Sequence, residues 1–179
     1  MALPDSYRVV ERRARFEQLY RAHAGAIRTY AARRVSSEAA ADDVVSDVFL
    51  VVWRRLDDVP DEPLPWLLAT ARRALANRRR SERRSAALTD RLVGLRRPHS
   101  ASAPETGDRL LDSLAVIPEP DRELLMLVAW EGLEPREIAE ILGLRPGTVA
   151  VRLHRARGRL AAALARHDSN AGAPLEARS

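Results

Sequence analysis

Residues 134–160, EPREIAEILGLRPGTVAVRLHRARGRL, decide the predicted fold of this chain. Three apolar residues near the start of this stretch repeat at helical spacing: Ile138, Ile141 and Leu142. Gly143 follows them, and glycine just beyond a helix is a common way to end it. Pro146 then stands where a second helix begins, because proline is well tolerated at the first helical position. The stretch therefore predicts two short helices joined by a tight turn.

The second of these helices is predicted to have two faces that run side by side. The buried face is apolar and consists of Val149, Leu153, Ala156 and Leu160. The neighbouring face has a similar spacing and consists of Thr148, Arg152, Arg155 and Arg159. From Ile141 to His167 the sequence holds six arginines and no acid. This arrangement is typical of a helix-turn-helix, whose second helix enters the major groove of DNA, although an ordinary helical hairpin with a solvated basic face has the same pattern.

The composition of the whole chain limits the classes of protein to which it can belong. At 179 residues the chain has room for one domain or two small ones. It contains no cysteine, which excludes disulfides and thiolate metal sites. No apolar run approaches the length of a membrane span, and the N-terminus is too charged for a signal peptide, so we expect a cytoplasmic protein without membrane insertion. The net charge of +5 suits a polyanionic partner.

Charge is distributed along the chain in two acidic-to-basic runs. Residues 38–62 hold eight acids and two arginines, and residues 66–84 hold seven arginines and one acid. Residues 108–140 then hold nine acids and three arginines before the acid-free basic stretch begins. Two modules, each with a basic end, favour two contacts on one nucleic acid over a single uniform surface.

The first module is predicted to contain three helices. The apolar spacing indicates a helix over 10–35 after a loose segment at 1–9, and a second helix over 37–56. Three prolines in the nine positions 57–65 prevent that helix from continuing. Trp66 then opens a third, arginine-rich helix. An aromatic residue at this position has two possible roles. It can stack on a base while the arginines bind the phosphates of the nucleic acid, or it can anchor the helix in the protein core.

The second helix of this module carries its acids beside an apolar surface. Asp43, Asp47 and Leu50 form one stripe along it, and such acids are typical partners for the positive end of a helix dipole. An acidic rim on an apolar helix also favours docking on a basic protein surface. The enzymatic alternative is a nuclease that uses Asp42, Asp43 and Asp47. No histidine or further converging ligand stands nearby, so we expect no metal, no cofactor and no catalytic residue.

The rest of the chain is predicted to contain a linker, a second helical module and a tail. The stretch 85–107 is rich in Ser, Ala, Pro and Arg and is predicted to be a flexible linker. A second module over 108–166 places two short helices before the helix-turn-helix. The tail at 167–179 has no apolar period and is predicted to be disordered. The predicted fold is therefore all-α, with two small helical domains, the first at 10–84 and the second a four-helix domain of helix-turn-helix type.

This order of modules resembles the extracytoplasmic-function group of sigma-70-type RNA polymerase sigma factors. The resemblance covers about residues 14–165 and rests on three motifs: AADDVVSDVFLVVW, PWLLATARRALANRRR and LAVIPEPDRELLMLVAWEGLEPREIAEILGLRPGTVAVRLHRARGRL. It implies a protein that binds core RNA polymerase and promoter DNA and directs transcription initiation, and the apolar surfaces of both modules would suit an anti-sigma factor. A free-standing helix-turn-helix regulator is the alternative, but it leaves the first module without a role.

The resemblance also implies roles for individual residues. By this resemblance, the residues that dock on the polymerase clamp helices are Asp43, Ser46, Asp47 and Leu50. Melting of the minus-ten element falls to the loop at 57–65 and to Trp66, Arg72, Arg73, Asn77, Arg79, Arg80 and Arg83. Reading of the minus-thirty-five element falls to Arg145, Thr148, Ala150, Val151, Arg152, His154, Arg155 and Arg157.

Two pairs of residues in the second module depart from the pattern of the family. Glu134 and Arg145 replace the usual capping serines, a change expected to cost each helix about 1 kcal/mol. Ala150 and Val151 can meet a thymine methyl group but cannot make bidentate hydrogen bonds to a base. We therefore expect phosphate contacts by the arginines of this helix to supply much of its affinity for DNA.

Overall fold

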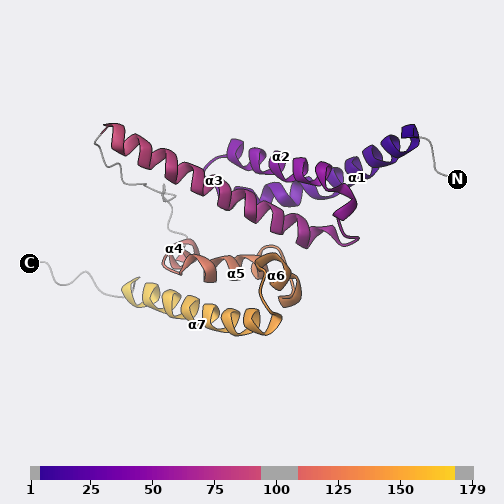
Figure 1. The fold of residues 1–179 in the computed structure, drawn as a ribbon. Coiled ribbons are helices and arrows are strands. Elements are labelled where there is room, and N and C mark those ends of the chain that lie inside the picture. Colours follow the sequence, from indigo (N-terminus) through magenta and orange to yellow (C-terminus); the bar gives the residue numbers. More distant parts are fainter. Residues whose placement is uncertain (1–4, 94–108, 172–179) are drawn as a thin grey trace, which may run out of the picture. The chain divides into compact units, whose positions relative to one another are not determined.

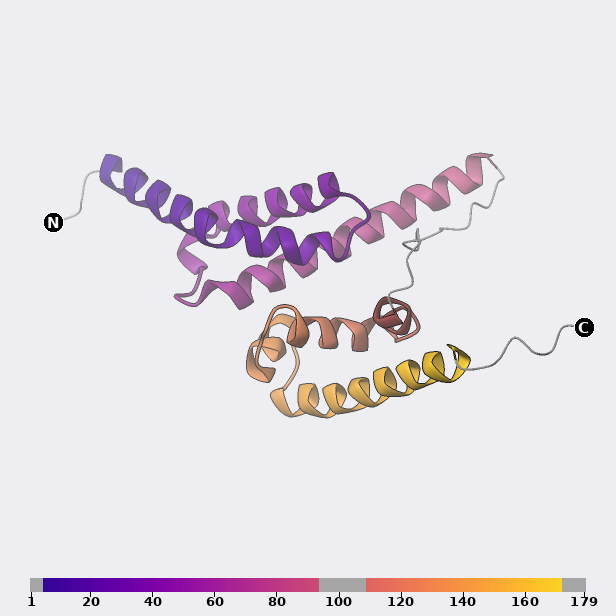
Figure 2. The ribbon, with the colours of Figure 1, turned by 180° about the vertical axis from the view of Figure 1, so that it is seen from behind.

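The computed structural model describes residues 5–93 and 109–171, which are helical apart from short turns. These residues form seven α-helices and one short 3-10 helix and include no β-strand, so the all-α prediction is confirmed. The chain divides into two units, Met1–Ala101 and Ser102–Ser179, each of which is described by itself (Figure 1, Figure 2). No helix in the described ranges is both long enough and apolar enough to cross a membrane.

Three helices and a short 3-10 turn build the first unit. They are α1 (Asp5–Ala32), α2 (Glu38–Arg54), η1 (Leu56–Asp58) and α3 (Pro63–Val93). Each of the three α-helices packs against the other two. Ser37 caps the start of α2, because its hydroxyl oxygen accepts a hydrogen bond from the Ala40 amide at 3.2 Å.

The core of this unit lies where the three α-helices meet. α1, α2, η1 and α3 all contribute fully buried side chains: Ile27, Tyr30, Val44, Val48, Val52, Leu56, Leu67 and Leu68. Burial of one such aliphatic side chain stabilises the fold by about 1.5–3 kcal/mol. Because α2 packs against both other helices, it buries the side that faces them, and its other side is exposed to solvent.

Four helices build the second unit. They are α4 (Arg109–Ala115), α5 (Glu119–Ala129), α6 (Pro135–Leu142) and α7 (Pro146–Ala171). α7 packs against each of the other three. Its buried side chains include three of the four predicted ones and one further residue: Val149, Leu153, Ala156 and Ala163. The fourth predicted residue, Leu160, is half-buried.

The turn between α6 and α7 has the geometry that its sequence predicts. Gly143 ends α6 in the left-handed conformation, with φ at 65°. The Leu144 amide donates to the Ala139 carbonyl at 2.9 Å, which closes the end of the helix. At the start of α6 the Glu137 carboxylate accepts a hydrogen bond from the Glu134 amide at 2.7 Å. This bond is half of a capping box, and it offsets the loss expected from the missing serine.

Three helices extend beyond their predicted ends. α1 begins at Asp5, inside the segment that was predicted to be loose. α3 runs to Val93, through the first part of the predicted linker, and α7 runs to Ala171, into the predicted tail. Neither glycine nor proline interrupts α3 after its first turn, and a nucleated helix propagates at little further cost until a breaker residue such as Gly94. The remainder of the predicted linker and tail lies outside the described residues.

Candidate protein and nucleic-acid interfaces

The predicted docking residues share the solvent-facing side of α2. All of them are exposed, and each lies three or four residues from two of the others: Asp43, Ser46, Asp47 and Leu50. Leu50 is 53% exposed, and Trp53 on the next turn is 44% exposed. The Trp53 ring packs edge-on against Phe16 of α1, with 5.3 Å between the ring centres. This face of α2 therefore combines an acidic rim with an exposed apolar surface.

Two of the four docking residues already have partners within the unit. The Asp43 carboxylate accepts a hydrogen bond from Nη1 of Arg78 on α3 at 2.9 Å, and this bond raises the pKa of the Arg78 guanidinium. The Ser46 hydroxyl donates to the Asp42 carbonyl at 3.0 Å, within its own helix. The Asp47 side chain makes no hydrogen bond or ion pair in the part of the chain that the structure describes. Asp47 is thus the acid of this face that is open to a partner.

The three carboxylates that a nuclease would use, those of Asp42, Asp43 and Asp47, lie in different environments. Asp42 accepts a hydrogen bond from Nε of Arg28 on α1 at 2.7 Å, whereas Asp43 is bound to Arg78 and Asp47 faces solvent. Within residues 5–93 and 109–171 no group of three or more histidine or carboxylate side chains is placed to hold a metal ion. Asp42 and Asp43 thus join α2 to its neighbouring helices, whereas Asp47 does not.

Trp66 lies in the first turns of α3 and is half-buried. The guanidinium carbon of Arg55 lies 6.0 Å from the centre of its indole ring. The backbone carbonyl of Trp66 accepts a hydrogen bond from the Thr70 hydroxyl at 2.9 Å. Part of the indole is thus packed and part is accessible, so stacking on a base and anchoring the helix are both compatible with this position.

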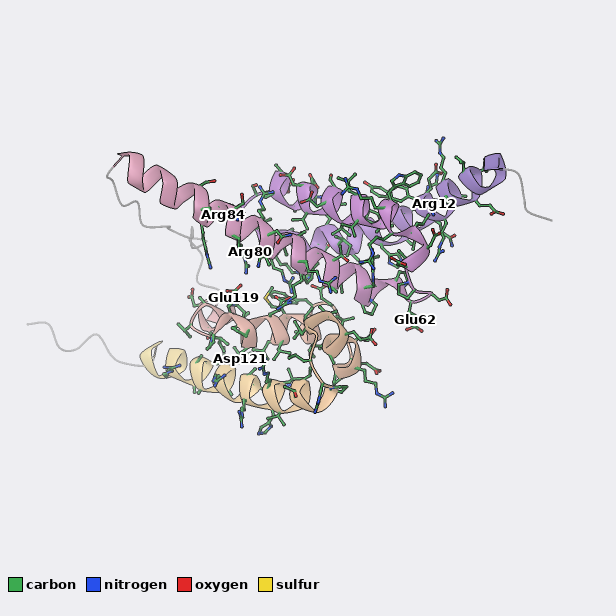
Figure 3. The ribbon with its side chains drawn as sticks, viewed as in Figure 1. Arg12, Glu62, Arg80, Arg84, Glu119 and Asp121 are labelled. Carbon is green, nitrogen blue, oxygen red and sulfur yellow. The ribbon has the colours of Figure 1, made fainter. Side chains whose placement is uncertain are left out.

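The other predicted minus-ten residues form one cationic face of α3, which we call the arginine face. Its members are Arg72, Arg73, Asn77, Arg79, Arg80 and Arg83. All are exposed except Arg79, which is half-buried, and Arg80 donates a hydrogen bond to the Asn77 side chain. Figure 3 labels Arg80 together with Arg84, which follows it by four residues on the same side of α3. The structure therefore brings these residues together on one surface.

The predicted minus-thirty-five residues are all exposed, on α7 or in the turn before it: Arg145, Thr148, Ala150, Val151, Arg152, His154, Arg155 and Arg157. Helical spacing places Arg152 and Arg155 along one edge of α7 and Ala150 and Arg157 along the opposite edge. Arg157 also lines an apolar groove of about 290 Å³, together with residues of α4, α5 and α7. The predicted set is therefore exposed as a whole, but Arg157 lies at the edge farthest from Arg152.

Two family models match the two units separately. The model described as Sigma-70 region 2 matches residues 19–85, which include α2, the loop after it and the arginine face. The model described as Sigma-70, region 4 matches residues 107–160, which include the helix-turn-helix. The chain belongs to the sigma-70 family of RNA polymerase sigma factors. Both matches cover the elements that carry the predicted interfaces.

This sigma factor is similar to curated relatives over most of its length. It is 33% identical to the RNA polymerase sigma factor CarQ of Myxococcus xanthus over 149 residues, which cover 78% of this chain and 83% of CarQ. It is 32% identical to the ECF RNA polymerase sigma factor SigL of Mycobacterium tuberculosis over 145 residues, which cover 76% of this chain and 81% of SigL. These similarities place it in the extracytoplasmic-function group.

A solved structure has the same two-domain fold. It contains CnrH, whose curated sequence comes from Cupriavidus metallidurans, in complex with the cytosolic domain of CnrY. The TM-score with this sigma factor is 0.59 at 28% sequence identity, and the match covers 84% of this chain and 88% of CnrH.

One charged contact of this sigma factor was not visible in its sequence. Arg159 of α7 donates a hydrogen bond to the carboxylate of Asp121 on α5, and Asp121 is only 8% exposed. Helical spacing grouped Arg159 with the arginines that are predicted to face DNA, whereas in the structure it contributes to the contact between α5 and α7. Local spacing carries no signal for this pair, because its members are 38 residues apart.

Proposed function

We propose that this sigma factor binds core RNA polymerase and directs promoter-specific transcription initiation, as a cytoplasmic binding subunit without catalytic residues, metal or cofactor. The observation that carries the proposal is that the two family matches fall on two separate helical units, each of which exposes an arginine-rich helix. An operator-binding regulator needs only the second unit. The first unit, with its acidic and apolar docking face, supports the polymerase-bound function over that alternative.

The exposed face of α2 is the proposed polymerase-docking surface. Asp47 and Leu50 lie on adjacent turns and present a free carboxylate beside exposed apolar area. A basic protein surface with an apolar centre complements this arrangement in charge and in polarity. The charge of Asp43 is partly neutralised by Arg78, and the Ser46 hydroxyl is already bonded to its own helix, so Asp47 and Leu50 carry most of the proposed docking.

The loop after η1 and the arginine face of α3 form the proposed minus-ten surface. A protein that holds single-stranded DNA needs cations for the phosphates and a flat side chain on which a base can stack. The exposed arginines of α3 supply the cations, and the accessible part of the Trp66 indole supplies the flat surface. Arg55 lies beside that ring, with its guanidinium paired with Asp58.

The exposed side of α7 is the proposed minus-thirty-five surface. Arg152 and Arg155 offer hydrogen-bond donors along one edge, and Val151 beside them is 52% exposed. An exposed valine can contact a thymine methyl group in the major groove, whereas the arginines can reach either guanine or phosphate. Arg157 lies at the other edge with its stem against the apolar groove, which suits a phosphate contact better than a base contact.

An anti-sigma factor is a further proposed partner. Support comes from CnrH, which was solved with a second protein bound to it, the cytosolic domain of CnrY. This chain offers two apolar surfaces that such a partner would cover, the exposed Leu50 and Trp53 in the first unit and the groove beside Arg157 in the second.

In vitro transcription tests the proposed function directly. The purified protein is added to sigma-free core polymerase with a pool of promoter fragments from its own genome, and the RNA starts are mapped. Discrete starts that depend on the protein and share two upstream motifs are expected. The absence of starts, together with specific duplex binding by the protein alone, would establish the operator-binding regulator instead.

A further inference from the structure

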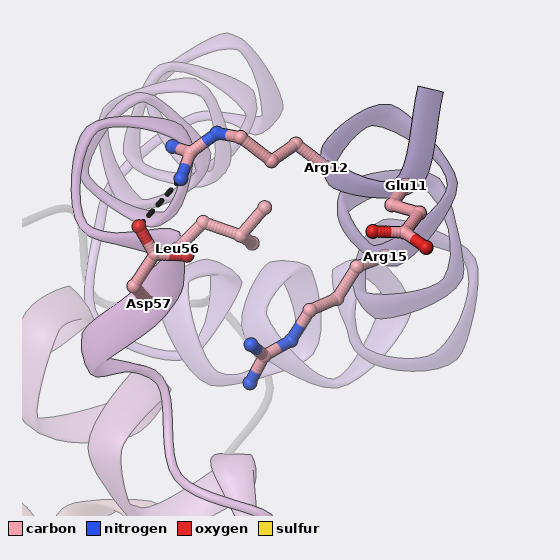
Figure 4. A pocket seen from close by; sticks show the side chains of 5 residues that line it. All are labelled: Glu11, Arg12, Arg15, Leu56 and Asp57. Atoms are coloured by element: carbon pink, nitrogen blue, oxygen red, sulfur yellow. Dashed lines mark hydrogen bonds and ion pairs between the residues drawn. The ribbon is translucent and has the colours of Figure 1, made fainter. Parts of the chain in front are cut away.

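Two arginines of α1 hold the loop between α2 and α3. Arg15 donates from Nη2 to the backbone carbonyl of Val59 at 2.9 Å. Arg12, almost one turn earlier, donates from Nη1 to the Asp57 carboxylate at 2.6 Å and from Nη2 to the Trp53 carbonyl at 3.3 Å. Figure 4 shows the Arg12 side chain reaching from α1 to Asp57. α1 thus contributes hydrogen bonds to the end of α2, to η1 and to the residue that follows η1.

An open space lies beside these bonds, between α1 and η1. A cavity of about 560 Å³ separates the two segments and is lined by Glu11, Arg12, Arg15, Leu56 and Asp57 (Figure 4). A second cavity of about 230 Å³ is lined in part by Arg15, His23 and Pro60. Arg15 lines both cavities, so its side chain lies between them. Removal of Arg15 would take away the hydrogen bond at Val59, while the bonds from Arg12 to Asp57 and Trp53 would remain.

The two arginines differ in how much they contribute. The Arg12 and Asp57 side chains are 38% and 80% exposed, and an ion pair in such a position adds little stability. Arg15 binds the carbonyl of Val59, a residue that is only 3% exposed. A hydrogen bond from a charged donor is stronger than a neutral one, and water competes less for a partly buried carbonyl. The acceptor of Arg15 is thus better shielded from water than the acceptor of Arg12, although the Arg15 side chain is itself exposed.

We propose that Arg15 is a positioning residue for the minus-ten element, with Arg12 in a supporting role. It holds the loop after η1 in the shape that receives the unpaired strand, and it acts through Val59 without touching DNA. This inference rests on the proposed function of the loop. Loss of Arg15 changes strand opening and base preference at the minus-ten element, and leaves polymerase docking unchanged because the docking residues lie on the exposed side of α2.

The experiment compares Arg15→Ala and Arg15→Lys with a matched control, Arg13→Ala. Arg13 lies on the same helix, is 76% exposed and pairs with Glu17 of its own helix, so its loss removes the same charge without touching the loop. Lysine keeps a cationic donor and tests for rescue. Circular dichroism and a polymerase-binding titration confirm that each variant folds and docks. Should Arg15→Ala fail to fold, Arg15→Gln, which keeps most of the side-chain length without the charge, carries the same comparison.

Permanganate reactivity of unpaired thymines, on a promoter that the wild type opens, reports strand opening. We expect Arg15→Ala to reduce opening about tenfold, the factor that corresponds to one charge-assisted hydrogen bond. Arg15→Lys should recover part of it, and Arg13→Ala should behave as the wild type. Promoters altered at each minus-ten position should show a flattened base preference for Arg15→Ala.

Equal opening and equal base preference by the Arg15 and Arg13 variants, on a promoter that the wild type transcribes, would overturn the positioning role and leave the sigma-factor function intact. Failure of the wild type itself to start transcription with core polymerase would instead overturn the proposed function on which the inference rests.

Discussion

Arg78 of α3 is bound to Asp43 of α2 by a 2.9 Å hydrogen bond between Nη1 and Oδ2. The same guanidinium contacts Glu82 on its own helix at 3.2 Å. This pair joins the helix that carries the proposed docking face to the helix that carries the proposed minus-ten face. Polymerase docking that uses Asp43 therefore draws on a carboxylate that Arg78 already partly neutralises.

Arg78→Gln should raise the affinity for core polymerase by up to about fivefold, because Asp43 would present its full negative charge to the partner and an exposed ion pair of this kind is worth roughly 0.2–1 kcal/mol. A fluorescence titration with labelled core polymerase measures the change. Arg83→Gln is the control, since Arg83 is exposed on the same helix and has no ion pair among the described residues. Weaker docking by Arg78→Gln would show that the pair orders the docking face and does not compete with it.

Asp47→Arg should weaken polymerase binding by at least about tenfold, because a charge reversed at a complementary interface meets a like charge on the partner. Asp47 is better suited to this test than Asp43, whose replacement would also break the contact with Arg78. The same titration measures the loss, and circular dichroism should show an unchanged helical content because Asp47 is exposed. Asp112→Arg, an equal charge change at an exposed position of α4, should dock as the wild type. Equal affinity of the two variants would remove α2 as the docking face.

Arg152→Ala and Arg155→Ala should each weaken binding to the preferred minus-thirty-five sequence by about 1–3 kcal/mol if these arginines contact bases. Electrophoretic mobility shifts of the polymerase-bound protein, on promoters changed one base pair at a time, measure affinity and specificity together. Arg166→Ala is the control, because Arg166 lies further along α7 and donates to the Ala162 carbonyl of its own helix. A loss that is equal on all sequences, with a shallower dependence on salt, would identify phosphate contacts instead.

Gly143→Ala should lower the free energy of unfolding by about 1 kcal/mol, because an L side chain is disfavoured at φ 65°. Gly158→Ala within α7 should raise it by roughly 0.5–1 kcal/mol, since alanine is the better helix former. An added Cβ meets no atom within 4 Å at either position, so the two variants differ only in backbone conformation. Urea unfolding followed by circular dichroism compares them. Equal stabilities would contradict the assignment of Gly143 as the residue that ends α6.

Most of the fold was predictable because it depends on short-range patterns. The apolar spacing of Ile138 and Ile141, with Gly143 and Pro146 after them, predicts the two helices and the turn of the helix-turn-helix. Helix ends were less predictable, because a helix continues until a breaker residue stops it, which is why α3 extends to Val93.

The sequence by itself determined the helices, the turn and the order of the two units. It also determined the exposed faces of α2 and α7, because a helical face follows from the spacing of apolar and polar residues over a few turns. Only the tertiary structure decided which charges are free. The pairs Arg78–Asp43, Arg159–Asp121 and Arg15–Val59 join residues that are 35, 38 and 44 positions apart. An arginine has a long stem and binds whatever acceptor helix packing brings within its reach. Spacing along one helix therefore cannot separate an arginine that holds the protein together from one that faces DNA.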